Sequence, residues 1–549
     1  MRRLVRSSLS VLSLGLALGL APVSAAPDQF VIFVNTTEDI ATDSNHCLPG
    51  DNPCSLRGAI EKIQGAAVAG TIRACYDPAT TPRGKKCPPG RKPLAVTDPG
   101  YDPATGRWTL EFGENAIPYN FTAAGTAIDF GADIVDYAGP QDNRIVIRPG
   151  ASEMAYAFVV EGPGSTFKGF TLSGAYEQAA IMVRYDGFSG GARDNQFGPG
   201  LSFANINPGV GIILRDRQTI GNRFVGNWCG LEGDGSVRAT VSEDCVQIMN
   251  GASRNVIGGQ DLKDRNILAG SGIGSAVSVF ESAPANLIVG NWIGLNAKGQ
   301  PEANNGGITV KLGANNTEII DNRISANKVA GIAIFDTTSG TVIRGNRIGL
   351  LEDGSCAGNG DVGIAINNQV FNALIEGNEI SCNDKGGVSI QGAAAKSIHL
   401  RRNLFEDNDG PPINIGQGAN NKIKPPQLSL ASPERIIGSA PGCLGGPVEI
   451  YSDSKEQAGS YEGEVQADGA TGLFIFNPSG PFKYNKVTAV CTDINNNTSA
   501  FALHRAMGST APTPTPTRTP FPSPTGGTPQ VELRSVFIPS VLKNGRLGQ

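Results

Sequence analysis

Two phenylalanines and one lysine occupy the same position in short segments that alternate apolar and polar residues: Phe280, Lys311 and Phe335. If these segments are strands stacked in register about 4.8 Å apart, the Lys311 ammonium lies between two rings that are about 10 Å apart. Asn367 occupies the same position one segment later. Aromatic rings beside a cation and an amide on a flat face are suited to contacting sugars. Phe280, Lys311, Phe335 and Asn367 are therefore candidate ligand-binding residues.

Two carboxylates directly follow the phenylalanines, Glu281 and Asp336. The same stacking separates them by about 10 Å, close to the separation of the two carboxylates in inverting glycoside hydrolases. With Lys311 between them, they suggest an alternative, the catalytic groove of a carbohydrate-active enzyme. The sequence contains no Gly-His-Gly or Arg-Ile-Lys triplet, and His399 stands alone in its segment. We therefore assign no catalytic residue, and a plain solvated face is the third interpretation.

The elements that would position these side chains are internal repeats. Six asparagines each open a phrase of the form Asn-x-hydrophobic, at steps of 25, 31, 24, 32 and 25 residues. Each repeat also holds an alternating strand, such as 307–312 or 331–335. A repeat of roughly 24 residues cannot bury its own apolar side chains, but stacked coils can. The asparagines are interpreted as turn residues, because Asn tolerates left-handed backbone and its amides form ladders: Asn266, Asn291, Asn322, Asn346, Asn378 and Asn403.

This pattern predicts an all-β chain built around a parallel β-helix. The run from about 205 to 415 resembles the right-handed parallel β-helix repeats of bacterial secreted proteins, in which a "GNxIGxxxxG" turn alternates with a "GIxI" strand. Weaker coils extend the stack back to about residue 143, and "DNDGPPINIG" resembles a last coil. We assign the β-helix to residues 143–424.

Residues 27–142 are predicted to cap the open end of the stack. In "NPCSLRGAIEKIQGAA", Ser55 is a candidate N-cap and Arg57 and Glu61 are spaced as an i,i+4 ion pair. A short helix is expected to bury one apolar face: Leu56, Ala59, Ile60 and Ile63. The phrase resembles the "CSLREAI" signature of CSLREA-domain proteins, although Gly58 stands where that family has Glu. The Pro-rich stretch 71–142 is expected to form a disulfide-pinned loop.

Residues 1–26 have the basic start, apolar stretch and small-residue end of a secretory signal peptide. We expect a monomeric protein that is secreted or held at the bacterial cell surface. Loss of three signal arginines would take the formal net charge from −5 to about −8. No Lys/Arg cluster remains elsewhere, which argues against nucleic acid as a partner, and no later run is long enough to span a bilayer.

Ten cysteines in an exported chain favour disulfides. There is no Cys-x-x-Cys, and His46, His399 and His504 are scattered, so no zinc site is expected. Nearest-neighbour pairing predicts five bridges: Cys47–Cys54, Cys75–Cys87, Cys229–Cys245, Cys356–Cys382 and Cys443–Cys491.

After Pro425 the period disappears and longer strands follow at sandwich-like spacing. Residues 425–505 resemble a small Ig-like module. Within it, Asp493, Asn495 and Asn497 have a spacing that suits either a calcium site or a plain turn. Residues 506–530 form a Pro/Thr-rich linker, and 531–549 form a short apolar tail.

Together these features predict an exported, surface-associated β-helix protein with a structural or adhesive role. Its sheet face and loops are expected to contact a polysaccharide, a cell-surface glycan or another surface. The alternative is a polysaccharide lyase or glycoside hydrolase acting in a groove on the β-helix, around Glu281, Lys311 and Asp336.

Overall fold

The computed structural model describes residues 31–39, 47, 53–66, 69–112, 118–150, 154–187 and 190–508. The predicted signal peptide, the predicted tail and all but the first three residues of the predicted linker lie outside these residues.

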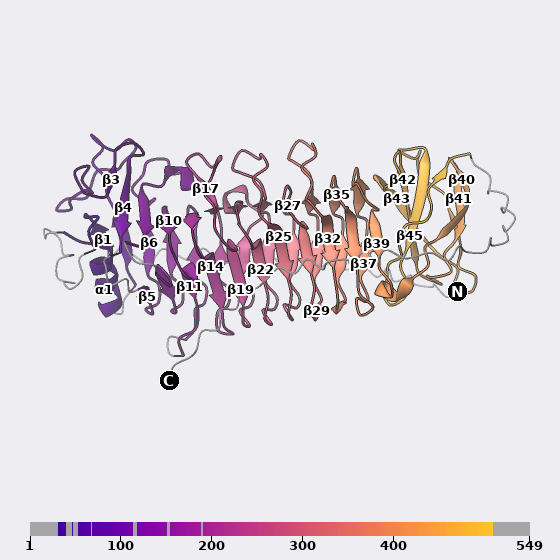
Figure 1. Cartoon of the computed structure of the whole chain (residues 1–549), viewed down its shortest axis with the longest axis horizontal. Coiled ribbons are helices and arrows are strands. Elements are labelled where there is room, and N and C mark those ends of the chain that lie inside the picture. Colours follow the sequence, from indigo (N-terminus) through magenta and orange to yellow (C-terminus); the bar gives the residue numbers. More distant parts are fainter. Residues whose placement is uncertain are drawn as a thin grey trace, which may run out of the picture. The chain divides into compact units, whose positions relative to one another are not determined.

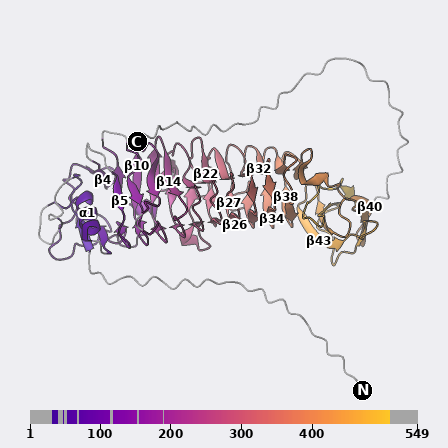
Figure 2. The ribbon, with the colours of Figure 1, turned by 90° about the horizontal axis from the view of Figure 1, so that it is seen from below.

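Three long sheets form most of the described chain, and successive strands of each sheet come from successive coils (Figures 1 and 2). Sheet 1 contains β1 (Val31–Val34), β2 (Thr71–Ala74), β6 (Ala127–Asp129), β9 (Thr166–Lys168), β12 (Gln196–Phe197), β15 (Arg223–Phe224), β20 (Val256–Gly258), β23 (Leu287–Val289), β26 (Glu318–Ile320), β30 (Val342–Arg344), β34 (Leu374–Glu376) and β37 (His399–Arg401). Sheet 2 contains β3 (Tyr101–Asp102), β4 (Arg107–Glu111), β7 (Ile145–Arg148), β10 (Phe170–Gly174), β13 (Ser202–Ile206), β16 (Trp228–Cys229), β21 (Ile267–Leu268), β24 (Trp292–Ile293), β27 (Arg323–Ile324), β31 (Arg347–Ile348), β35 (Glu379–Ser381) and β38 (Leu404–Glu406). Sheet 3 contains β5 (Tyr119–Phe121), β8 (Phe158–Val160), β11 (Ala179–Val183), β14 (Val210–Arg215), β19 (Val246–Met249), β22 (Ser275–Val279), β25 (Gly306–Val310), β28 (Ile332–Ile334), β32 (Val362–Ile366), β36 (Gly386–Ile390) and β39 (Ile413–Ile415).

Pairing within these sheets is parallel, apart from the antiparallel β3–β4 pair. Two short pairs lie outside them: β17 (Leu231–Glu232) with β18 (Val237–Arg238), and β29 (Thr338–Ser339) with β33 (Val370–Phe371). The chain is therefore an all-β parallel β-helix, as the repeats predict.

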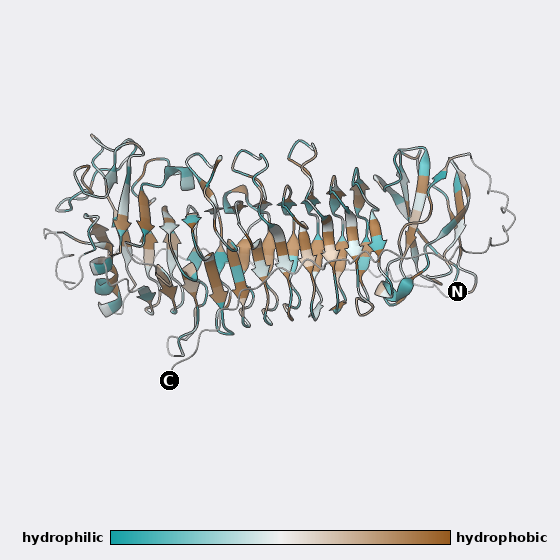
Figure 3. Cartoon of the chain, in the orientation of Figure 1, coloured by the Kyte–Doolittle hydropathy of each residue, from teal (hydrophilic) through white to brown (hydrophobic). Residues whose placement is uncertain are grey.

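The interior of the stack is dry and in register. In sheet 1 one inward residue of every strand pairs with its equivalent one coil away, and each is buried. Figure 3 shows that hydrophobic residues recur in strand after strand along the stack. Burying one such column over many coils removes a large apolar area from water, which is the main stabilising term. The column is Ile32, Ile72, Ile128, Phe167, Phe197, Phe224, Ile257, Ile288, Ile319, Ile343, Ile375 and Leu400.

The repeated asparagines form a buried ladder at the turn between sheets 1 and 2, which confirms their predicted turn position and amide ladder. The expected left-handed backbone belongs to the preceding residue instead, as at Gly290 and Asp321. From Asn266 to Asn403, the amide Nδ2 of each donates to Oδ1 of the next at 2.9 to 3.0 Å. Buried amides are stable only when hydrogen-bonded, so each rung requires its neighbours. Similar ladders occupy two further turns: Asn195, Asn222, Asn255 and Asn286; and Asn304, Asn327, Asn359, Asn383 and Asn408.

Helix α1 (Leu56–Ala66) forms the predicted cap, with the four expected apolar residues buried. Ser55 caps it, because its Oγ accepts the backbone N–H of Gly58 at 3.0 Å. The predicted pairing of Arg57 with Glu61 is wrong: Arg57 binds Asp39 at 2.8 Å. Asp39 offers both carboxylate oxygens to the guanidinium, a geometry that an i,i+4 helix neighbour rarely achieves.

Parallel pairing also extends further toward the N-terminus than residue 143. Strand β1 pairs with β2, β2 with β6, and β5 with β8. These first coils bury aromatic side chains such as Tyr76 and Trp108 in place of alternating Ile and Val. The coils therefore lack the periodic pattern on which the boundary was based.

All five disulfides join the predicted partners. Among the described residues, none of the helices is long and apolar enough to cross a bilayer.

Residues 427–506 form two antiparallel sheets around a core of their own. One contains β40 (Gln427–Ser432), β41 (Arg435–Ser439) and β44 (Leu473–Phe476). The other contains β43 (Ser460–Gln466), β42 (Pro447–Asp453), β45 (Lys486–Cys491) and β46 (Arg505–Ala506). We call this segment the C-terminal module. Three short 3-10 helices complete the described structure: η1 (Pro140–Asp142), η2 (Leu262–Asp264) and η3 (Ala419–Lys422).

The C-terminal module contacts the last coil through polar groups. Asn497 Oδ1 accepts the backbone N–H of Ser397 at 2.8 Å, and Thr498 Oγ1 accepts that of Leu400 at 2.9 Å. Asn420 bridges the two parts, since its Nδ2 donates to the carbonyl oxygens of Ile398 and Thr498. The module thus supplies the partners that a further coil would otherwise provide.

Candidate functional site

The predicted column lies on the outer face of sheet 3 with the expected register. Lys311 Nζ is 5.5 Å from the centre of the Phe280 ring and 5.7 Å from that of Phe335. Asn367 follows in the next coil, where its backbone N–H donates to Ile334 O at 3.0 Å. All four side chains are half-buried. Because both rings already contact the Lys311 ammonium, the column is a cation–π ladder that stabilises the sheet face itself.

The two carboxylates beside this column are turn residues. Glu281 and Asp336 have left-handed backbone, with φ of 51° and 54°. Asp336 Oδ1 accepts Nδ2 of Asn368 at 2.9 Å, and exposed Leu312 occupies the intervening coil. Asn and Asp are the residues that adopt this conformation most readily and bond the neighbouring turn. The arrangement therefore favours a turn role for Asp336 over a catalytic one.

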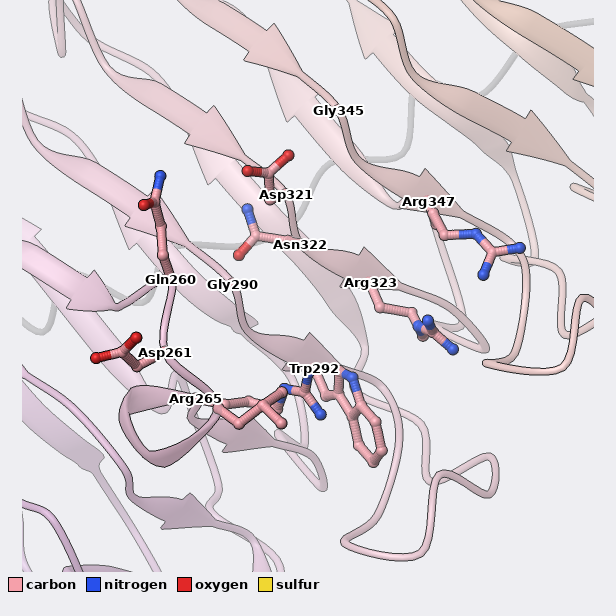
Figure 4. Close-up of a pocket in the computed structure, with 11 residues that line it drawn as sticks. Gln260, Asp261, Arg265, Gly290, Trp292, Asp321, Asn322, Arg323, Gly345 and Arg347 are labelled. Atoms are coloured by element: carbon pink, nitrogen blue, oxygen red, sulfur yellow. The ribbon is translucent and has the colours of Figure 1, made fainter. Parts of the chain in front are cut away.

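A walled pocket lies on the other side of the stack, at the turn between sheets 1 and 2 (Figure 4). Its volume is about 270 Å³. None of the sequence-predicted ligand-binding or catalytic residues lines it. The lining residues are Gln260, Asp261, Leu262, Arg265, Gly290, Trp292, Asp321, Asn322, Arg323, Gly345 and Arg347.

Local sequence explains why the coils are hollowed here. Arg265, Gly290, Asp321 and Gly345 each precede a ladder asparagine, so they occupy one turn position in four successive coils. Gly290 and Gly345 have positive φ, of 69° and 64°, and a Cβ there would lie 2.1 Å from Gly259 O and 2.3 Å from Asp321 Oδ1, so glycine allows the neighbouring turns to pack closely beside Asp321. Residues 259–264, including η2, have no counterpart in the next three coils, and three of them, Gln260, Asp261 and Leu262, line the pocket.

Trp292 forms the floor of the pocket and lies between two arginines. The Arg265 guanidinium is 4.4 Å from the centre of the indole ring, and that of Arg323 is 5.8 Å from it. Strand register places Arg323 next to Trp292, and Arg347 one coil further (Figure 4). Trp292 is 9% exposed, so both cations lie against a largely desolvated ring.

The guanidinium groups are incompletely paired. Nε of Arg265, and Nε and Nη1 of Arg323, are buried and donate to no atom of the described residues. Burial lowers the pKa of both Arg265 and Arg323. The neighbouring positive charges of Arg347 and Arg265 lower the pKa of Arg323 further. Arg347, in contrast, is bound to Glu379 at 2.7 Å. The pocket thus holds positive charge and N–H donors without sufficient acceptors of its own.

The pocket's two carboxylates are exposed at its edge. Asp261 lies in the inserted wall, 3.8 Å from Lys263, and Asp321 lies in the glycine-flanked turn. Within the described part of the chain no group of three or more His, Cys, Asp or Glu side chains is placed to hold a metal ion. The arrangement is chemically suited to binding a ligand rich in acceptor oxygens.

The other titratable candidates lie away from this pocket. His399 is in β37, and burial lowers its pKa. His504 contacts the Gln457 carbonyl at 2.8 Å within the C-terminal module, and burial lowers its pKa too. His46 lies outside the described residues.

Of the two interpretations of Asp493, Asn495 and Asn497, the structure favours the turn. Asp493 Oδ1 accepts the backbone N–H groups of Asn495 and Asn497 at 2.9 and 2.8 Å. Nδ2 of Asn497 donates to the same carboxylate. These contacts use the carboxylate oxygens that a calcium ion would need.

Sequence reasoning missed Trp292 and its arginines because it interpreted the "GNWIGL" phrase only as a turn. The residue between Asn and the hydrophobic position faces outward on sheet 2. Its type was the signal that could have revealed the pocket. Aligning that position gives Trp228, Ile267, Trp292, Arg323 and Arg347 in one column.

No protein-family model and no curated protein matches the chain. Among solved structures, it is similar to the A-module of the mannuronan C-5 epimerase AlgE6 of Azotobacter vinelandii, with 16% identity over 68% of this chain and 96% of that one, at a TM-score of 0.41. It is also similar to the catalytic domain of a GH87 α-1,3-glucanase in complex with tetrasaccharides, with 12% identity over 73% and 71% of the two chains and a TM-score of 0.39. The periplasmic alginate epimerase AlgG shares 11% identity over 57% and 78%, at a TM-score of 0.31. None of these similarities is close enough to transfer an activity to this chain.

Proposed function

We propose that this chain is an exported, surface-associated β-helix protein with a structural or adhesive role, and that it contacts glycan through the pocket over Trp292. One observation carries the proposal: a walled hollow of about 270 Å³ that combines an aromatic floor with several unpaired N–H donors. Sugar-binding sites combine N–H donors for hydroxyl oxygens with aromatic rings, and here the Trp292 ring supports the two guanidinium groups that carry the donors. The flat column at Phe280 and Phe335 is the weaker candidate, since its residues do not line this pocket and carry no buried N–H group that lacks an acceptor among the described residues.

The test is a glycan array probed with the exported chain and two variants, Trp292→Ala and Trp228→Ala. The two tryptophans occupy the same phrase and the same sheet and are equally exposed, at 9%, but Trp228 does not line the pocket. We expect the Trp292→Ala variant to lose at least ten-fold in affinity and the Trp228→Ala variant to bind as the parent does. Equal losses in both variants, or no binding of the parent to any glycan, would contradict the proposal.

A second candidate function is a carbohydrate-active enzyme, either a polysaccharide lyase or a glycoside hydrolase. It is favoured by Asp261 and Asp321, which bring two carboxylates to the edge of the same pocket. Assays for reducing ends and for unsaturated products would reveal it. Turnover that Asp321→Asn abolishes would establish this function in the pocket, whereas turnover abolished by Asp336→Ala would move it to the sheet 3 column.

The domain plan belongs to the same proposal. We infer that residues 1–26 direct export, that the "CSLRGAI" segment is a CSLREA-type cap, and that residues 425–505 are an Ig-like module before a spacer and tail. Five disulfides support an oxidising location outside the cytoplasm. Fractionation of cells producing the full chain and a chain without residues 1–26 tests the export step, since only the former should leave the cytoplasm.

A further inference from the structure

The pocket over Trp292 selects for charge. We propose that its ligand is an acidic polysaccharide, with carboxylate or sulfate groups bound by Arg265 and Arg323. This inference rests on the proposed glycan-binding function and names the class of glycan.

The first argument is the state of the guanidinium groups. Three N–H groups of Arg265 and Arg323 are buried without an acceptor among the described residues, and neither side chain forms an ion pair there. Several exposed arginines of the stack are paired, as Arg344 is with Glu376 at 3.0 Å. Nε of Arg73, Arg144 and Arg193 is also buried without an acceptor, but only Arg265 and Arg323 among these five described arginines lie against one aromatic ring. A buried donor without an acceptor is costly, and a carboxylate or sulfate oxygen is the acceptor that a guanidinium binds most strongly.

The second argument is the balance of charge around the pocket. Arg265, Arg323 and Arg347 come from three coils and face one side of the stack (Figure 4). Four carboxylates are near them. Glu379 is committed to Arg347, Asp261 and Asp321 are exposed at the edge, and Glu352 is exposed on its loop. None of the four forms an ion pair with Arg265 or Arg323 among the described residues, so the two guanidinium groups remain available to a ligand anion.

The third argument is length. The lining residues come from four successive coils, so the first and last are about 14 Å apart along the stack. Arg265 and Arg323 come from the first and third of these coils with Trp292 between them, so the two available charges are spaced along the stack, as the charges of an extended acidic polymer are. A single small anion would require convergence on one point, which this arrangement does not provide.

The experiment uses two ligand pairs that differ only in charge. Oligogalacturonate is compared with its methyl ester, and dextran sulfate with dextran, by calorimetric titration of the exported chain. We expect the acidic member of at least one pair to bind ten-fold or more tightly than its neutral partner, with affinity falling as salt rises. The ligand pair that shows this difference identifies the recognised anionic group as carboxylate or sulfate.

Variants locate the effect. Arg323→Gln and Arg265→Gln should each lower affinity for the acidic ligand at least ten-fold and affinity for the neutral partner by a smaller factor, so that the preference for the acidic member falls. Arg148→Gln is the matched control, because Arg148 is an exposed arginine of the same sheet that pairs with Glu111. Circular dichroism and melting curves would establish that each variant is folded.

The outcomes separate the two proposals. Equal binding of acidic and neutral partners would overturn the charge preference and leave glycan binding intact. Binding of the acidic partner that Arg323→Gln and Arg265→Gln do not weaken would overturn the assignment to this pocket. If no member of either pair and no glycan on the array binds, both proposals fail.

Discussion

The hydroxyl of Thr498, in the C-terminal module, accepts the backbone N–H of Leu400 in the last strand of sheet 1 at 2.9 Å. The backbone of Thr498 also donates to Ile398 O at 3.2 Å. A strand at the end of a sheet exposes unpaired backbone groups, which invite association with other chains. The module therefore ends the sheet by hydrogen bonding to its edge strand as well as by covering it.

The first prediction concerns this contact. Thr498→Val keeps the shape of the side chain but removes the acceptor of the Leu400 N–H, so the last coil should lose about 1–3 kcal/mol of stability. Hydrogen exchange should accelerate in peptides covering 397–405 and stay unchanged in peptides covering 307–335. Ser454→Ala, at an exposed position, serves as the control. Unchanged exchange at 397–405 would show that the hydroxyl contributes nothing to the edge.

The second prediction concerns the asparagine ladder. Asn322 Oδ1 accepts two N–H groups of Asn291, and its own Nδ2 donates to Asn346 and to Ile288 O. Asn322→Ala leaves several buried polar groups unpaired, so the free energy of unfolding should fall by at least about 3 kcal/mol. Asn495→Ala, at an exposed turn, should change it by less than about 0.5 kcal/mol. Urea denaturation measures both, and similar values for the two variants would contradict a structural ladder.

The third prediction concerns the cation–π column. Lys311→Met removes the ammonium between Phe280 and Phe335, which should cost about 1–2 kcal/mol for two half-exposed contacts. Lys396→Met, at an exposed position, is the matched control. Glycan binding should be the same in both variants and in the parent. A Lys311→Met variant that keeps full stability but loses binding would place the ligand on sheet 3 instead.

The fourth prediction concerns pH. Burial raises the pKa of the Glu449 carboxyl, although hydrogen bonds from Tyr451 and from the Arg402 backbone oppose the shift. Since the folded protein holds this proton more tightly than the unfolded chain, folding is favoured below the ordinary glutamate pKa. That contribution is lost as pH rises through the raised value.

Glu449→Gln removes this titration. The free energy of unfolding of the variant minus that of the parent should therefore increase as pH rises from about 4 to 7, measured in urea at each pH. Other buried carboxyls titrate in both proteins and cancel in the difference. A difference that is independent of pH would show that Glu449 keeps an ordinary pKa when folded.

The coil architecture and the register of sheet 3 could be predicted because both follow from repetition. Each "GIxI" segment aligns with the next in only one way that keeps its isoleucines inside, so Lys311 had to lie between Phe280 and Phe335. Each cysteine is close in sequence to one other cysteine, and this similarly restricted the possible disulfide pairings. In the cap helix, the apolar face and the Ser55 cap are local features and could be read directly.

The pocket could not be predicted in the same way. It is bordered by Gly290 and Gly345, whose lack of a Cβ allows neighbouring turns to approach closely, and by an insertion at 259–264 whose path no periodicity specifies. The partner of Arg57 was missed because Asp39 is distant in sequence and reaches the helix only in the folded chain. The first coils bury aromatic side chains in place of alternating Ile and Val, so their strands could not be predicted from the sequence pattern.

The coils from Asn266 to Asn403 bond to their neighbours through the same ladder and the same strand register. A tandem duplication of one whole coil could therefore be accommodated without creating a new exposed edge, and it would lengthen the stack by about 4.8 Å. The chemistry of the Trp292 pocket would remain unaltered while its separation from the last coil grew. The length of the stack and the binding chemistry of the pocket are thus independent properties of this molecule, and evolution or design can adjust either one alone.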